Sequence, residues 1–145
     1  MYQDLENAKS YLSKENCTCV LCRDDQLFSS KHRGVRPLLT FLDSGKDFAG
    51  FSAADKVVGK ATAFLYCLLG VRAIHAGVLS DAAAEVLTQA NIWFSCDSRV
   101  PAIRNRENTG PCPMEQATKD ISDPHLALSA IRDTLKALQQ KQAAE

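Results

Sequence analysis

The chain has 145 residues, a length that fits one domain with a sizeable core, here residues 1–145. Its 17 basic and 17 acidic side chains balance, so no net field would recruit a nucleic acid polymer or an anionic membrane. The first twenty residues include the charged side chains of Asp4, Glu6, Lys9 and Lys14 and hold no long apolar run, which argues against a signal peptide or a membrane anchor. The six cysteines are therefore expected to stay reduced, in a cytoplasm.

The beginning of the chain predicts a helix, a hairpin and a second helix. Apolar residues recur at helical spacing over about residues 3–15. The run 17–22 is β-prone, Asp24 and Asp25 favour a turn, and residues 27–30 return, so a hairpin is expected. The second helix is predicted over 34–45, with a proline in its first turn.

The predicted fold is arranged around residues 54–70. Asp55 is a suitable N-cap and Gly70 a suitable end, and the residues between them are apolar on nearly every side, which predicts a buried helix. Lys56 and Lys60 would lie one turn apart near its N-terminus. Because positive side chains repel the positive end of a helix dipole, the helix start is predicted to bind an anion. The alternatives are that both lysines reach solvent and that Asp55 is only a cap.

Strands and helices alternate through most of the chain. The remaining expected elements are strands over 48–53, 71–79 and 92–96, a helix over 80–90, a loop over 97–111, and helices beginning at Pro113 and Pro124.

This order predicts an α/β fold, a three-layer α/β/α sandwich around a five-stranded mixed sheet with an N-terminal hairpin and parallel later strands. Ligands of such sheets bind beyond the carboxyl ends of the strands. Segments 33–37 and 54–60 and the loop after the fifth strand are expected to meet there. Their basic side chains would be those of Arg36, Lys56, Lys60, Arg104 and Arg106.

The element order is also that of the cytidine deaminase-like fold. Three motifs resemble an uncharacterised bacterial and archaeal family of that superfamily: residues 34–39 (GVRPLL), residues 54–61 (ADKVVGKA), and Asn105-Arg106…Thr109-Gly110…Cys112-Pro113-Met114-Glu115. The resemblance covers almost the whole chain and implies the fold, but it implies no reaction. The candidate ligand-binding residues are Arg36, Asp55, Lys56, Lys60, Asn105, Arg106, Thr109 and Gly110.

The zinc motifs of deaminases are missing at both predicted helix starts. A zinc deaminase needs His/Cys-x-Glu at one helix start and Pro-Cys-x-x-Cys at the next. Residues 33–37 and 55–56 offer neither a thiolate nor an imidazole. His75 is not followed by the required glutamate, and the motif at Cys112 lacks its second cysteine. No metal site and no cofactor are therefore predicted.

The other cysteines and His75 are interpreted as core residues. On a strand, Cys17 and Cys19 would share one face and Cys22 the other, so these three cannot close a tetrahedral metal site alone. They are expected to be small buried side chains. His75, in an apolar strand, is expected to be a hydrogen-bonded core histidine.

Cys112 is the candidate for a reactive thiol. It precedes Pro113 at an N-cap-like position, where a helix end and nearby arginines would lower the thiol pKa. With Glu115 or Asp55 as acid–base partner it would be a nucleophile or redox centre. The alternative is that residues 109–111 form a turn and Cys112 only packs.

The favoured function is a cytoplasmic domain of deaminase-like fold, without zinc, that binds an anionic and nucleotide-like small molecule. An enzyme that uses Cys112 is the second hypothesis. A non-catalytic interaction module is the third, and a homodimer is left open.

Overall fold

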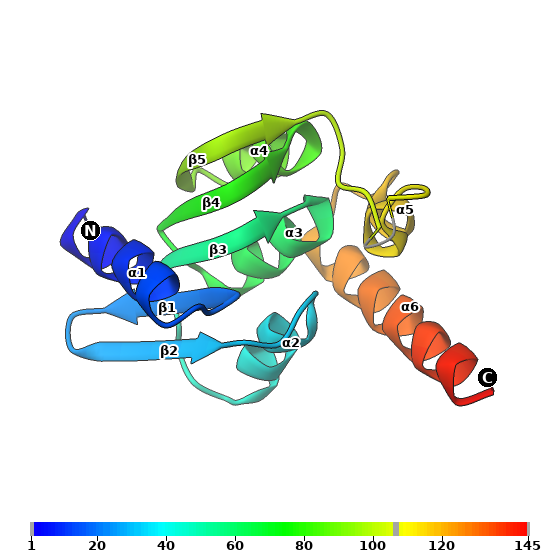
Figure 1. The fold of residues 1–145 in the computed structure, drawn as a ribbon, viewed down its shortest axis with the longest axis horizontal. Helices are drawn as coiled ribbons and strands as arrows, with labels where there is room; N and C mark the ends of the chain where they lie inside the picture. Colours follow the sequence, from blue (N-terminus) through cyan, green and yellow to red (C-terminus); the bar gives the residue numbers. More distant parts are fainter. Residues whose placement is uncertain (1, 106–107, 145) are drawn as a thin grey trace.

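The computed structural model describes residues 2–105 and 108–144 (Figure 1). In these ranges the chain forms an α/β fold with six helices and one five-stranded mixed sheet. The helices are α1 (Tyr2–Lys14), α2 (Arg36–Asp43), α3 (Lys60–Leu69), α4 (Asp81–Gln89), α5 (Pro113–Thr118) and α6 (Pro124–Ala144). The strands are β1 (Cys19–Arg23), β2 (Gln26–Ser30), β3 (Ser52–Val58), β4 (Ala73–Ser80) and β5 (Trp93–Val100).

The strand order in the sheet is β2-β1-β3-β4-β5. The hairpin β1–β2 is antiparallel and joins the sheet through an antiparallel pairing of β1 with β3. Strands β3, β4 and β5 run parallel, so their carboxyl ends reach the same edge of the sheet. The predicted hairpin is confirmed. Its turn contains no glycine, and Asp24 adopts the left-handed conformation there, at φ 52°.

Helices pack on the sheet through two separate apolar clusters. On one side, Ala8 and Leu12 of α1 pack with Cys17, Val20, Cys22 and Ala54. The larger cluster includes side chains of α2, α3, α4 and α6, and its largest fully buried members include Phe64, Leu65, Tyr66, Ile74 and Leu79. The expectation that Cys17, Cys19 and Cys22 are buried core residues is confirmed.

Most predicted elements are found within a few residues of their expected bounds. Helix α4 begins as predicted, because the Ser80 hydroxyl accepts the Ala83 N–H at 3.1 Å. Gly70 ends α3 at φ 80°, and its N–H donates to the Tyr66 carbonyl. In the described ranges, no helix is long and apolar enough to cross a membrane.

The prediction for the central stretch is wrong in its first part. Residues 54–58 belong to β3, and the helix begins only at Lys60, after Gly59 in an extended conformation. Residues 48–51 form a turn instead of the expected strand, since the Phe51 N–H donates to the Phe48 carbonyl at 3.1 Å. The predicted loop over 97–111 is shorter than expected, because β5 continues to Val100.

Candidate functional site

The start of α3 lies at the carboxyl end of β3, and a carboxylate from a distant part of the chain accepts a hydrogen bond from its backbone. The Lys60 N–H donates to Glu115 Oε1 at 3.0 Å. Gly59 gives this carboxylate room, because a Cβ at Gly59 would collide with the Glu115 carboxyl and lie 3.2 Å from Ile103 Cγ1. A side chain of α5 thus caps α3, whose own N-cap residue has no side chain.

Glu115 also connects α3 to the neighbouring helix start. The buried Ser80 hydroxyl, which accepts the Ala83 N–H, hydrogen-bonds to Glu115 as well. Burial raises the pKa of the Glu115 carboxyl, while hydrogen bonds from the Lys60 N–H and from Ser80, and the Lys60 charge, partly oppose the rise. The result is a half-buried carboxyl that lines the space beside it.

That space is a pocket of about 210 Å³. Its lining residues come from the starts of α3 and α4, the segment after β5, and α5, and they are Lys60, Ser80, Ala82, Pro101, Ala102, Ile103, Pro111, Glu115, Gln116 and Lys119. The Lys60 ammonium donates to the Lys119 carbonyl at 2.8 Å, which holds it at the C-terminal end of α5. The pocket therefore combines apolar walls with one carboxyl and two ammonium groups.

The structure brings two of the predicted site residues, Lys60 and Glu115, into this pocket, whereas Asp55, Lys56 and Arg36 do not line it. Asp55 is not a helix cap. It lies in β3 and is buried, and it accepts the Tyr66 hydroxyl at 2.7 Å and the Val57 N–H at 3.2 Å. Burial raises the pKa of Asp55 to about 7, against the lowering effect of these hydrogen bonds.

Lys56 does not share a helix face with Lys60. It is exposed on β3, and its ammonium donates to Asn16 Oδ1 at 2.9 Å. Arg36 is exposed at the start of α2 and does not line the pocket. The expected convergence of Lys56, Lys60 and Arg36 on one anion site is therefore wrong.

The predicted residues of the long loop form a small structure of their own. Asn105 Oδ1 accepts the Thr109 N–H at 2.9 Å, and the Asn105 N–H donates to the Gly110 carbonyl at 3.0 Å. Arg104 donates to Asn108 Oδ1 at 2.6 Å. Arg106 lies outside the described residues. This loop contributes to the pocket through its two ends, at Pro101–Ile103 and Pro111.

Cys112 occupies the N-cap position of α5, as predicted, but makes no cap with its side chain. Its N–H donates to the Ile103 carbonyl at 3.1 Å, and the residue is half-buried. It does not line the pocket that holds Glu115, so its reactivity stays a prediction. Among the described residues, no group of three His, Cys, Asp or Glu side chains is placed to hold a metal ion.

Lys119 is not among the residues that the sequence predicts for the site, and Ser80 is predicted only as a helix cap. Ser80 directly follows a predicted parallel strand. Because ligands bind beyond the carboxyl ends of such strands, this position is the signal that could have predicted Ser80 as a site residue. No comparable signal exists for Lys119, which enters the pocket only because α5 folds back over the start of α3.

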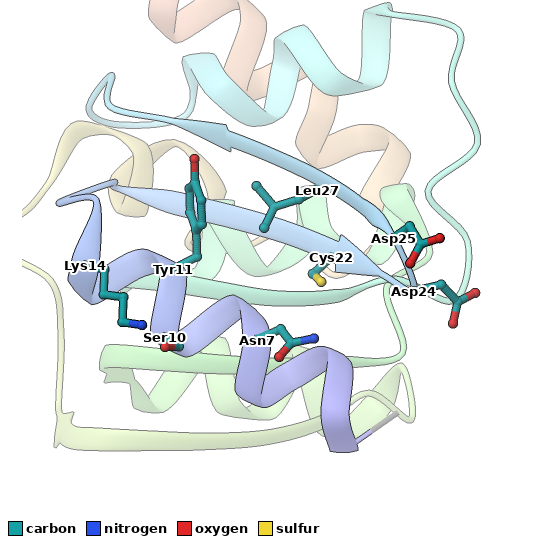
Figure 2. A pocket seen from close by; sticks show the side chains of 8 residues that line it. All are labelled: Asn7, Ser10, Tyr11, Lys14, Cys22, Asp24, Asp25 and Leu27. Atoms are coloured by element: carbon teal, nitrogen blue, oxygen red, sulfur yellow. The ribbon is translucent and has the colours of Figure 1, made fainter.

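A second pocket, of about 290 Å³, lies between α1 and the hairpin (Figure 2). One helix face supplies Asn7, Ser10, Tyr11 and Lys14, and the hairpin supplies Cys22, Asp24, Asp25 and Leu27. Figure 2 shows Lys14 at one end and the two aspartates at the other. None of the predicted site residues lines this pocket.

Across the described residues, the sheet order and the pocket at its carboxyl edge define an α/β protein with one mixed sheet and a candidate site lined by two helix starts, the segment after β5 and α5. The sequence profile of a family described as TM1506, a domain of unknown function (DUF1893), matches residues 7–135, so the chain belongs to this family. A solved structure of a DUF1893 family protein, TM1506 from Thermotoga maritima, is similar over 94% of this chain and 91% of that one. The TM-score is 0.83 and the sequence identity is 25%. No protein with curated annotation matches the chain.

Proposed function

We propose that the chain binds a small nucleotide-like molecule in the pocket at the carboxyl edge of β3 and β4. The observation that carries this proposal is the Glu115 carboxyl, which is fixed on the Lys60 N–H and faces a pocket that also contains two lysines. We place this function in a cytoplasmic protein and in a three-layer fold of cytidine deaminase-like type. The supporting features of that fold are the N-terminal hairpin and the three parallel strands β3, β4 and β5.

The chemistry of the lining residues specifies the kind of ligand. A half-buried carboxyl recognises N–H donors such as the amino edge of a heterocycle. The side chains of Pro101, Ile103 and Pro111 offer apolar contact to a flat ring. Lys119, exposed at the edge of the pocket, is placed to bind an anionic group.

The size of the pocket limits what it encloses. Its volume of about 210 Å³ is below the range of roughly 300–1,000 Å³ that is typical of enclosed small-molecule sites. We therefore expect the pocket to enclose a heterocycle while the phosphate stays at the edge, near Lys119. Free phosphate alone would bind more weakly, because it would face Glu115 without using the apolar walls.

A thermal shift series with nucleoside monophosphates tests the proposal. A ligand that binds only the folded protein raises the melting temperature by mass action, and the charged contribution should decrease at high salt. Glu115→Gln and Lys119→Ala should each remove most of the shift. Lys56→Ala is the matched control, because Lys56 is bound to Asn16 and does not line the pocket.

The control also separates this proposal from the anion site predicted at Lys56. A shift that is kept in Lys119→Ala and Glu115→Gln but lost in Lys56→Ala would contradict the pocket assignment. Failure of all nucleoside monophosphates at millimolar concentration to move the wild-type curve would remove the proposal.

A further inference from the structure

Three side chains with acid–base and nucleophilic chemistry lie together on β4 and β5, away from the pocket of Glu115. His75 pairs with Ser95 in the parallel ladder, and His75 Nδ1 lies 2.7 Å from Ser95 Oγ. Asp97, two residues further along the strand, places Oδ1 3.2 Å from His75 Nε2. The predicted hydrogen-bonded core histidine is therefore confirmed, and its two partners are a hydroxyl and a carboxylate.

The carboxylate determines where the neutral imidazole carries its proton. An ionised Asp97 can only accept, so His75 Nε2 must be the protonated nitrogen that donates to it. Nδ1 then has a free lone pair directed at the Ser95 hydroxyl, which donates to it. This is the arrangement in which a histidine acts as general base toward a serine, with the roles of the two ring nitrogens exchanged relative to serine hydrolases.

The surroundings leave this group accessible from one side of the sheet. Helix α1 packs against β1 and β3 and less extensively against β4, and Figure 1 shows β5 at the far edge from the hairpin. The His75 side chain is only 9% exposed, whereas that of Asp97 is 76% exposed. Trp93, two residues before Ser95 on the same strand, is 50% exposed. A flat aromatic group can therefore stack on Trp93 beside the Ser95 hydroxyl.

We propose that Ser95 is a nucleophile that His75 and Asp97 activate. It accepts the acyl group of aryl esters of small carboxylic acids. Because the Asp97 carboxylate is largely solvated, it stabilises an imidazolium less than a buried carboxylate would. The proposal is therefore limited to esters with a good leaving group, such as a phenolate. It rests on β4 and β5 alone and is independent of the nucleotide pocket.

The reaction is an ordinary two-step ester hydrolysis. Ser95 Oγ forms a bond to the carbonyl carbon as its proton moves to His75 Nδ1. The bond to the aryl oxygen then breaks, and the phenolate takes that proton and leaves as the phenol. Water attacks the acyl-Ser95 with His75 Nδ1 as base, the acyl–Oγ bond breaks, and a carboxylic acid and free Ser95 result.

Covalent labelling tests the nucleophile directly. The full chain is treated with a fluorophosphonate, which phosphonylates an activated serine with loss of fluoride, and the adduct is located by peptide mass spectrometry. In parallel, 4-nitrophenyl acetate is used to measure acylation. We expect one adduct, on Ser95, and none in Ser95→Ala. Ser98→Ala is the matched control, since Ser98 lies on the same strand outside the group, and it should label like the wild type.

Two further variants distinguish an activated serine from an accessible one. Asp97→Asn, at an exposed position that folding tolerates, should slow labelling and acylation by about tenfold to a hundredfold. His75→Gln should slow them at least as much, with circular dichroism confirming that this buried variant folds. Labelling of Ser95 no faster than of Ser98, or a rate unchanged in Asp97→Asn, would overturn the proposal.

Discussion

The Glu115 carboxylate accepts the backbone N–H of Lys60, a residue 55 positions earlier in the chain. This contact places an internal anion at the N-terminal end of α3, where the sequence predicts that an external one binds. It also fixes α5 over the carboxyl edge of the parallel strands and so closes one side of the pocket. The candidate site therefore depends more on the packing of α5 than on Lys56 and Lys60, the two lysines from which the sequence predicts an anion site.

Gly59→Ala is expected to lower the free energy of unfolding by about 1–3 kcal/mol, because the new methyl group displaces the Glu115 carboxyl and crowds Ile103. Urea unfolding measures the change. Repeating the substitution in a Glu115→Ala background provides the control, since much of the obstacle is then gone. An equal cost in both backgrounds would show that Glu115 does not lie over Gly59.

Gly77→Ala is expected to be among the most destabilising single changes in the sheet, by several kcal/mol. A Cβ at Gly77 would lie 2.6 Å from the Lys56 carbonyl oxygen, and a backbone atom inside a sheet cannot move aside as a side chain can. Gly110→Ala is the comparison, because its Cβ would meet nothing within 4 Å. Similar melting temperatures for the two variants would refute the close approach of β3 and β4.

Asp55 should make the protein less stable as the pH rises from about 4 to about 7. Burial raises the pKa of Asp55 from 3.8 to about 7 in the folded state, so in this window the folded chain holds a proton that the unfolded chain has lost. The free energy of unfolding then decreases with pH, by up to about 1.4 kcal/mol per pH unit, and this contribution levels off above pH 7.

The pH dependence is measured by urea unfolding at pH 5 and pH 7.5 in the wild type and in Asp55→Asn. The asparagine keeps an acceptor for the Tyr66 hydroxyl but does not titrate. We expect the variant to gain stability relative to the wild type at the higher pH. A difference between the two proteins that is the same at both pH values would contradict a raised pKa.

Elemental analysis tests the predicted lack of zinc. The starts of α2 and α3 carry Val35–Arg36 and Gly59–Lys60, and neither pair offers a thiolate or an imidazole. Purified protein should contain far less than one zinc per chain, and chelator treatment should leave its melting temperature unchanged. One zinc per chain that disappears in Cys112→Ala would reverse this prediction.

The sequence predicts the elements with clear periodicity or clear end signals. Helix α1 shows its apolar stripe, Ser80 caps α4, and Gly70 ends α3. The boundary between β3 and α3 could not be predicted in the same way, because residues of a central strand are apolar on both faces, as are those of a buried helix. Gly59, extended between the two, is the missed signal.

The candidate site was predicted only in part for a related reason. The sequence marks Lys60 by its place near a helix start and Glu115 by its motif, and the structure places the two in contact. Lys56 belongs to the predicted site only if residues 54–58 are helical; in β3 its ammonium donates to Asn16 Oδ1 instead. The Ser95–His75 pair could not be predicted, because it depends on the register between β4 and β5.

The most direct test of the proposed function is a titration of ¹⁵N-labelled protein with a nucleoside monophosphate, followed by amide chemical shifts. If the pocket binds the ligand, the shifts should be largest at Lys60, Ile103 and Gln116, and those at Asn16 and Lys56 should stay constant. The shifts should also be lost in Glu115→Gln. Shifts confined to the region of Lys56, or no shifts at millimolar ligand, would contradict the assignment of this pocket.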